Sequence, residues 1–190
     1  MIAASAALLA GPAHAQSHDQ ALIGGHAGTG SEGRIAVNQA AGVGNAQANL
    51  AALAHADSGL GIASAHAMQK ATPAQRAAAA SATIDGGAFN DVSGALSLNQ
   101  AAGTANLQLN TIAIGTGGLL LAHADDAALA NTTGSATSTE GAATATPDRR
   151  ALIDIDAFRG SQGVVQVNQT AGVGNLSTNA IVLQLPGGTP

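Results

Sequence analysis

The stretch Val92-Ser-Gly-Ala-Leu-Ser-Leu-Asn-Gln-Ala-Ala-Gly-Thr-Ala-Asn-Leu-Gln-Leu-Asn110 decides the fold, because the same frame occurs at two other places in the chain. It aligns without gaps with residues 31–49 and with residues 161–179. The shared pattern is G-x-x-x-V/L-N-Q-x-A-G-x-x-N-x-x-x-N. Three ungapped copies define an internal repeat, and a repeat of this kind sets the architecture of the whole chain.

The repeated amides are the candidate functional residues. Asn and Gln side chains at equivalent positions of stacked strands can hydrogen-bond to one another in ladders along the stack. We therefore expect ladders from Asn38, Gln39, Asn45 and Asn49; from Asn99, Gln100, Asn106 and Asn110; and from Asn168, Gln169, Asn175 and Asn179. The repeat also fixes Gly33, Gly94 and Gly163 before the amides, and the expected turn glycines Gly42, Gly103 and Gly172 after the Asn-Gln pair.

Each repeat predicts a strand, a turn and a second strand. Leu96 and Leu98 alternate with polar residues, and this period of two is typical of a strand. The following Ala-Gly-x-x-Asn stretch has turn chemistry. In the second strand the apolar pattern shifts by one residue after Asn110 and after Asn179, which predicts a bulge or an arc there.

A single strand–turn–strand unit is not stable alone, so the repeats must stack. The predicted fold class is all-β: three strand–turn–strand repeats stack as a β-solenoid or cross-β structure, joined by disordered or partly helical linkers. Layers would lie about 4.7–4.8 Å apart. Val37, Leu98 and Val167, with the Leu and Ile residues that follow, are expected to form the dry interior. Stacking within one chain and stacking between chains both fit the pattern.

The Asn-Gln pairs are unevenly spaced, which predicts linkers of free length between the repeats. They lie 61 residues (99 − 38) and 69 residues (168 − 99) apart. The expected organisation is a signal-peptide remnant at 1–15, repeat 1 at 16–56, a linker at 57–83, repeat 2 at 84–121, a linker at 122–152 and repeat 3 at 153–190.

The N-terminus predicts export. Residues 2–11 form an apolar stretch of small residues, and Ala13-His14-Ala15 is an A-x-A-like cleavage site. An Ala-rich cytosolic helix is the alternative interpretation. Export would place the chain in the periplasm and then outside the cell.

Composition excludes several classes of protein. Charged residues make up 9% of the chain, and the formal net charge is −5, so no basic surface for nucleic acid is expected. The chain has no Cys, which excludes disulfides and thiolate metal sites. No Asp, Glu, Lys or Arg occurs at 35–56, 92–124 or 160–190, as expected if stacked layers avoid placing like charges together. No cofactor is expected.

The repeats resemble those of the Fap-type bacterial functional amyloids, in the V-N-Q-A-A-G-x-x-N-x-Q-x-N block and in the variable linkers that separate its three copies. The resemblance implies a fibre subunit in the biofilm matrix, exported through an outer-membrane exporter and assembling with itself and with related fibre subunits. It would add copies by templated β-stacking. The repeats are also similar to those of curli subunits, whose repeats are shorter and run nearly back to back.

The sequence also fits functions other than a fibre subunit. A monomeric secreted β-solenoid that acts as an adhesin or binding module is the main alternative. An enzyme is not expected, although Asp85, Asp154 and Asp156 could pair as catalytic carboxylates; solvated charges beside an aggregation-prone strand explain them better. His55 and His123 share the string Ala-His-Ala-Asp, but they lack a complete set of metal ligands.

Overall fold

The computed structural model describes residues 18–70, 78–125, 129–130 and 147–186, and within these ranges every regular element is a β-strand. This confirms the predicted all-β class. The chain shows no helix long and apolar enough to cross a membrane within the described ranges. The strands are β1 (His18–Ile23), β2 (Glu32–Val43), β3 (Ala46–His66), β4 (Gln69–Lys70), β5 (Ala79–Ile84), β6 (Ser93–Thr104), β7 (Leu107–Asp125), β8 (Leu129–Ala130), β9 (Arg149–Ile153), β10 (Gln162–Val173) and β11 (Leu176–Pro186).

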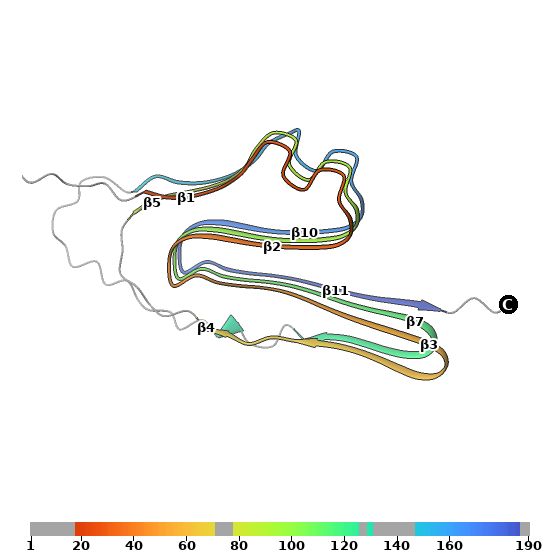
Figure 1. The fold of residues 1–190 in the computed structure, drawn as a ribbon. Coiled ribbons are helices and arrows are strands. Elements are labelled where there is room, and N and C mark those ends of the chain that lie inside the picture. The colour runs from red at the N-terminus through yellow and green to blue at the C-terminus, as the bar shows by residue number, and fades with distance from the viewer. Residues whose placement is uncertain (1–17, 71–77, 126–128, 131–146, 187–190) are drawn as a thin grey trace, which may run out of the picture.

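The strands form three stacked layers, and each layer follows nearly the same path (Figure 1). Layer 1 contains β1 to β4, layer 2 contains β5 to β8, and layer 3 contains β9 to β11. Every pairing between layers is parallel, and layer 2 is the middle layer in each three-stranded sheet. The three repeats therefore stack within one chain.

The layers are in register, so the repeated residues lie one above another. Asn99 pairs with Asn38 on one side and with Asn168 on the other. The same register holds from β1 through β2 and along β3 as far as Ala56, where the pairing with β7 shifts before it resumes at Leu60. Identical side chains can therefore meet along the stack.

Within each layer the chain folds back on itself (Figure 1). An arch, made by β1 and the turns that follow it, leads into β2, and a tight turn leads from β2 into β3. In layers 1 and 2 the long third strand then doubles back, and residues 60–66 of β3 pair with residues 119–125 of β7.

The doubling back corrects one expectation about the linkers. The sequence placed residues 57–83 in a disordered or partly helical linker, but β3 continues to His66 and β5 begins at Ala79. Residues 60–66 pair with residues 119–125 of β7, and β5 pairs with β1 and β9, so the backbone groups of both segments are satisfied without a helix. The expected signal at 1–15 and the central parts of both linkers lie outside the described residues.

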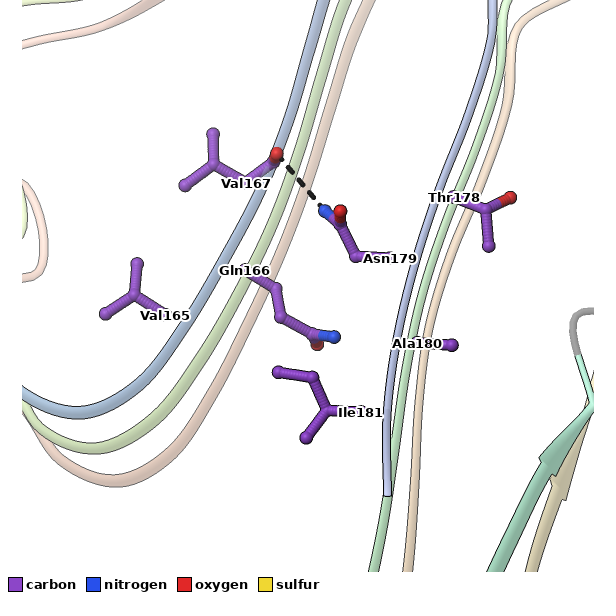
Figure 2. Close-up of a pocket in the computed structure, with 7 residues that line it drawn as sticks. All are labelled: Val165, Gln166, Val167, Thr178, Asn179, Ala180 and Ile181. Carbon is purple, nitrogen blue, oxygen red and sulfur yellow. Dashed lines mark hydrogen bonds between the residues drawn. The ribbon is translucent and has the colours of Figure 1, made fainter. Parts of the chain in front are cut away.

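The predicted bulge after Asn110 and Asn179 is wrong. Strand β11 pairs with β7 without a shift from Leu176 to Pro186. Asn179 and Ile181 both point toward β10, while Thr178 and Ala180 point away from it (Figure 2). The face of β11 toward β10 carries an amide at Asn179 and an aliphatic side chain at Ile181. The apolar residues of the sequence therefore shift by one position although the strand keeps its regular alternation.

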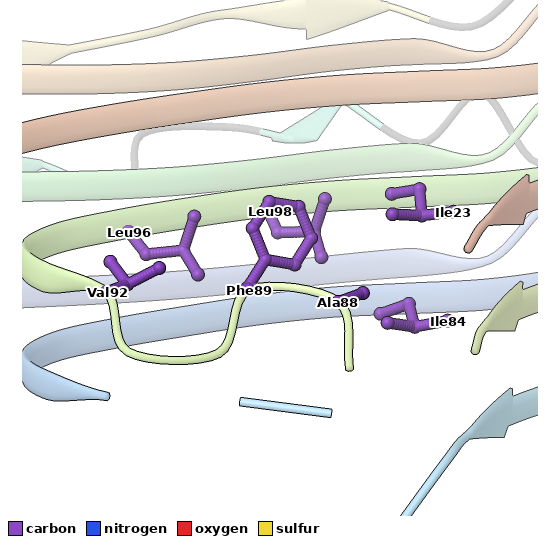
Figure 3. Close-up of a cluster of buried hydrophobic side chains, with 7 residues drawn as sticks. All are labelled: Ile23, Ile84, Ala88, Phe89, Val92, Leu96 and Leu98. Atoms are coloured by element: carbon purple, nitrogen blue, oxygen red, sulfur yellow. The ribbon is translucent and has the colours of Figure 1, made fainter. Parts of the chain in front are cut away.

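An apolar cluster fills the space between the arch and the first repeat strand (Figure 3). We call it the arch cluster. Phe89 of layer 2 stacks on Phe158 of layer 3, with ring centroids 5.7 Å apart and an angle of 11° between the ring planes. The buried members of the cluster are Ile23, Ile84, Ala88, Phe89, Val92, Leu96 and Leu98.

The expected single dry interior is therefore divided. Val37, Leu98 and Val167 belong to the arch cluster. In β7, Asn110 donates from its side chain to the carbonyl of Leu98, so its neighbour Leu109 points to the other side of the strand. Leu109 is buried there, away from β6. Beside Asn99 and Asn110 the space between β6 and β7 is occupied by polar side chains, and aliphatic residues enter it from Ile112, the register partner of Ile181.

Candidate functional site

The space between the first and second repeat strands holds a hydrogen-bonded network of asparagines. We call it the amide seam. In the middle layer, Asn99 Nδ2 donates to Asn38 Oδ1 at 2.9 Å and to Asn49 Oδ1 at 3.0 Å. Asn110 Nδ2 donates to Asn49 Oδ1 at 2.9 Å and to Asn99 Oδ1 at 3.0 Å. The seam contains Asn38, Asn49, Asn99, Asn110, Asn168 and Asn179.

The seam has a direction, because the amide nitrogens of each layer donate to oxygens of the layer before it. Asn168 Nδ2 donates to Asn99 Oδ1 at 3.0 Å, and Asn179 Nδ2 donates to Asn110 Oδ1 at 3.0 Å. Bonds within a layer join the two strands, as from Asn179 Nδ2 to Asn168 Oδ1 at 2.9 Å. The network thus holds the layers together and holds the strands of each layer together.

The middle of the seam is closed to solvent, since Asn99 and Asn110 are fully buried. A buried amide without partners costs about 1–3 kcal/mol, whereas a satisfied hydrogen bond contributes about 1 kcal/mol. The seam is stable only because each buried amide meets another amide or a backbone carbonyl. An Asn at each position in every layer meets that need.

The Gln of each Asn-Gln pair lies outside this seam, because adjacent residues of a strand point to opposite faces. Gln100 Nε2 donates to Gln39 Oε1 at 2.8 Å, and Gln169 Nε2 donates to Gln100 Oε1 at 2.8 Å. The same amide of Gln100 also donates to the carbonyl of Thr83 in β5 at 2.8 Å. This Gln column ties the repeat strand to the arch, so one dipeptide serves two interfaces.

A third amide column lies in the turn between the two repeat strands. Asn106 Nδ2 donates to Asn45 Oδ1 at 2.9 Å, and Asn175 Nδ2 donates to Asn106 Oδ1 at 2.7 Å. The backbone N–H of Asn106 donates to the same oxygen of Asn45 at 2.9 Å. The column stabilises equivalent turns one above another.

The turn glycine is required by close approach between layers. Gly103 has a φ of 111°, and a Cβ on it would collide with the carbonyl oxygen of Gly172. A Cβ on Gly42 would collide with the carbonyl of Gly103 in the same way. Positive φ and the short separation both favour glycine here.

Sequence reasoning missed a further polar column. Gln47 Nε2 donates to Gln108 Oε1 at 2.6 Å, and Gln108 Nε2 donates to the carbonyl of Gln100 at 2.9 Å. Layer 3 has Ser177 at this position, and its hydroxyl donates to Asn168 Oδ1 at 2.6 Å. The signal is the Gln of the N-x-Q-x-N block, which two of the three copies carry; the repeat frame requires identity in all three copies and therefore leaves this Gln out.

The strand register does not align the two candidate metal-binding strings. His55 pairs in register with Thr116, and His123 pairs with Ser64, so the two Ala-His-Ala-Asp strings do not align. His55 Nε2 instead contacts Asp57 Oδ1 at 2.9 Å. No group of three potential ligands that could hold a metal ion occurs among the residues described.

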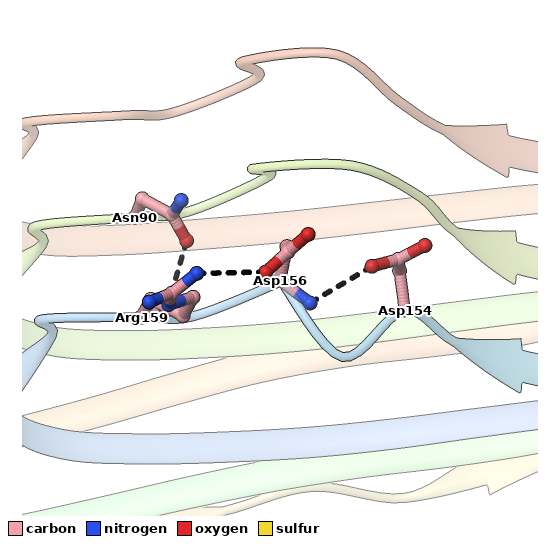
Figure 4. Close-up of polar contacts among 4 residues, drawn as sticks. All are labelled: Asn90, Asp154, Asp156 and Arg159. Atoms are coloured by element: carbon pink, nitrogen blue, oxygen red, sulfur yellow. Dashed lines mark hydrogen bonds and ion pairs between the residues drawn. The ribbon is translucent and has the colours of Figure 1, made fainter.

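The candidate catalytic carboxylates lie in the exposed turns of the arch and serve the backbone (Figure 4). Asp154 Oδ1 accepts from the backbone N–H of Asp156 at 2.8 Å, and Arg159 Nη1 donates to Asp156 Oδ1 at 2.8 Å. Asp85 Oδ1 accepts from the N–H of Gly86 at 2.8 Å. These contacts are typical of turns and do not pair two carboxylates for acid–base chemistry.

A known protein family matches the sequence of the chain. No solved structure matches the chain. The sequence matches the functional amyloid protein FapB/FapC family over residues 3–186, a span that takes in the linkers as well as the three repeats. Because the match covers nearly the whole sequence, the chain belongs to the functional amyloid protein FapB/FapC family.

Proposed function

We propose that the chain is the structural subunit of an extracellular amyloid fibre that grows by templated addition of copies to the ends of the stack. Membership of a functional amyloid family supports a self-assembling structural protein rather than an enzyme. The observation that carries the proposal is the pairing of the end layers. Among the described residues, β2 and β10 each pair with β6 alone, so each has one free edge.

The free edges of the end layers carry side chains equivalent to those that are buried between layers inside the molecule. Leu107 of the middle layer is 2% exposed, whereas Leu176, its equivalent in layer 3, is 46% exposed. On layer 3 an open depression of about 540 Å³ lies between β10 and β11. Another layer would cover these apolar side chains and pair the free backbone groups, which is the usual driving force for edge-to-edge assembly.

The proposed setting is the outside of the cell, in the biofilm matrix, with a role in adhesion. Support comes from the family and from the export signal expected at 1–15, which lies outside the described residues. Related fibre subunits and an outer-membrane exporter would be the other partners. Detection of fibres on intact cells, and their loss when residues 2–15 are deleted, would test this setting.

Seeded growth of the full chain tests the function itself. We expect fragments of preformed fibres to abolish the lag in thioflavin fluorescence, and fibre diffraction to show a meridional reflection at about 4.7–4.8 Å. A β-rich chain that stays monomeric and ignores seeds would contradict the fibre and favour a monomeric adhesin.

A further inference from the structure

We propose that successive copies stack head to tail, with layer 3 of one copy on layer 1 of the next, and that Arg149 and Asp19 form an ion pair across this joint. The inference rests on the proposed function and adds to it an order, a register and a polarity. The partner is a second copy of this chain, seated as if it supplied the next layer of the same stack.

The topology allows only one parallel joint. Layer 1 uses one edge to pair with layer 2, and layer 3 uses its opposite edge to do the same. The two free edges therefore point in opposite directions along the stack (Figure 1). A parallel, in-register pairing can continue only if layer 3 of one copy meets layer 1 of another. Contact between two like layers would require one copy to be turned over, so the paths of the two layers would not superimpose and equivalent residues would not meet.

Asp19 and Arg149 occupy the same position in the two end layers. Asp19 pairs with Ala80, and Ala80 pairs with Arg149. Both side chains lie beside the turn glycine of their own layer: a Cβ on Gly42 would be 2.8 Å from Asp19 Oδ2, and one on Gly172 would be 3.2 Å from Arg149 Cδ. Inside one molecule an alanine layer separates the two charges by about two strand spacings. In the joint they would be one spacing apart.

Burial makes this position sensitive to charge. Asp19 is 6% exposed although it lies in an end layer. An opposite charge stabilises a carboxylate more than an apolar cover does, so Arg149 of another copy suits this position better than an apolar residue would. The other two charged residues of β1 and β2, Glu32 and Arg34, would face Gln162 and Val164. The joint brings no like charges together along these strands.

Two repeated features continue across the same joint. A Cβ on Gly94 would collide with the carbonyl of Gly33, and one on Gly163 would collide with the carbonyl of Gly94. Gly33 has open space at this point, which the carbonyl of Gly163 from another copy would fill. The direction of the amide seam also continues, because Asn38 Nδ2 would donate to Asn168 Oδ1 of the copy before it.

Charge reversal tests the joint on the full chain. Asp19→Arg places two arginines at the joint, and Arg149→Asp places two aspartates there. We expect each variant alone to elongate from its own seeds at least about tenfold more slowly than the wild type, because two like charges would be brought together at a largely buried position of the joint. An equimolar mixture should recover growth, because the two variants alternate with opposite charges at every joint. The double variant Asp19→Arg/Arg149→Asp should also grow.

The matched control reverses the neighbouring charge, Arg150→Asp, which would face Gln20 in the joint and should slow growth less than about twofold, as is typical for an exposed charge. Wild-type rates for both single reversals, or losses that neither mixing nor the double reversal restores, would overturn the joint alone. A wild-type chain that forms no fibres would overturn the proposed function and the joint with it.

Discussion

The amide seam and the arch cluster lie on opposite sides of the same strand, β6, yet they tolerate different amounts of variation between layers. The seam has Asn at both of its positions in all three layers. In the arch cluster one position is Gly28, Phe89 and Phe158 in successive layers. Leu96 and its equivalents there are also different aliphatic residues.

The difference follows from the direction of the forces. An amide donates along N–H and accepts at its oxygen, so a buried amide needs a matching group at a fixed place in the next layer. Apolar contact has no direction, so the space left by a small side chain in one layer can be filled by a larger side chain from the neighbouring layer. The ring of Phe89 does this over Gly28, where an added Cβ would lie 2.5 Å from a ring carbon. Specificity of stacking therefore resides in the seam.

The largest expected effect is from a charge in the seam. Asn99→Asp removes an amide that donates to Asn38, Ala48 and Asn49, and turns a carboxylate toward their oxygens. We expect the free energy of unfolding, measured by guanidinium chloride denaturation, to fall by more than about 4 kcal/mol. Asn90→Asp is the control, because its Oδ1 only accepts from the backbone of Arg159 and a carboxylate can do the same. Equal losses would contradict the distinction between seam and arch.

The arch cluster should respond to volume rather than to identity. Phe89→Ala removes a buried ring and should lower the free energy of unfolding by about 3–5 kcal/mol, whereas Phe89→Leu should lower it by only about 1–1.5 kcal/mol. Denaturation curves of the two variants give the comparison directly. A leucine variant as unstable as the alanine variant would show that the arch cluster depends on residue identity as strongly as the seam does.

The shared space between Phe89 and Gly28 can be tested with a matched pair of glycines. Gly28→Ala should cost about 2–3 kcal/mol, because it adds overlap with the ring to the strain of a positive φ of 69°. Gly25 has nearly the same φ, 67°, and open space at its Cβ, so Gly25→Ala should cost only about 1 kcal/mol. The difference should vanish in a Phe89→Ala background, as thermal or chemical unfolding of the double variant would show.

The smallest effect concerns the turn beside the seam. Ala105 has a φ of 56°, and layers 1 and 3 have glycines, Gly44 and Gly174, at this position with φ of 70° and 67°. Ala105→Gly should therefore raise the free energy of unfolding by up to about 1 kcal/mol, through relief of left-handed strain. A lower denaturation midpoint would mean that packing of the methyl group in the turn stabilises the protein by more than the positive φ of Ala105 destabilises it.

The sequence predicted the seam better than the arch for the same physical reason. Asn38, Asn99 and Asn168 repeat because an amide column demands identity, and identity is visible without a structure. Phe89 and Gly28 have complementary volumes, and no pattern within the chain reveals complementarity between layers. In each Asn-Gln dipeptide, Asn lies in the seam and Gln contacts the arch. The contact of Gln with the arch could not be predicted, because strand alternation does not show that β1 runs beside β2.

The doubling back of β3 was also not predictable from the sequence. Residues 60–66 are rich in Ala, Gly and Ser, as suits a linker, and they become strand because residues 119–125 pair with them. Pairing with a distant segment overrides weak local propensity. The bulge expected after Asn179 is absent for a related reason, since a change from amide to aliphatic residues on one face produces the same sequence pattern as a bulge in the backbone.

The three-layer path of the chain has a consequence for the mass that a fibre carries per unit length. With strands spaced about 4.8 Å apart, each copy of 18.2 kDa would lengthen a filament by about 14 Å. A single filament of the full chain would then weigh about 1.3 kDa per ångström. A fibre in which each copy contributed only one layer would be about three times heavier for the same length, a difference that scanning transmission electron microscopy resolves without any knowledge of the fold.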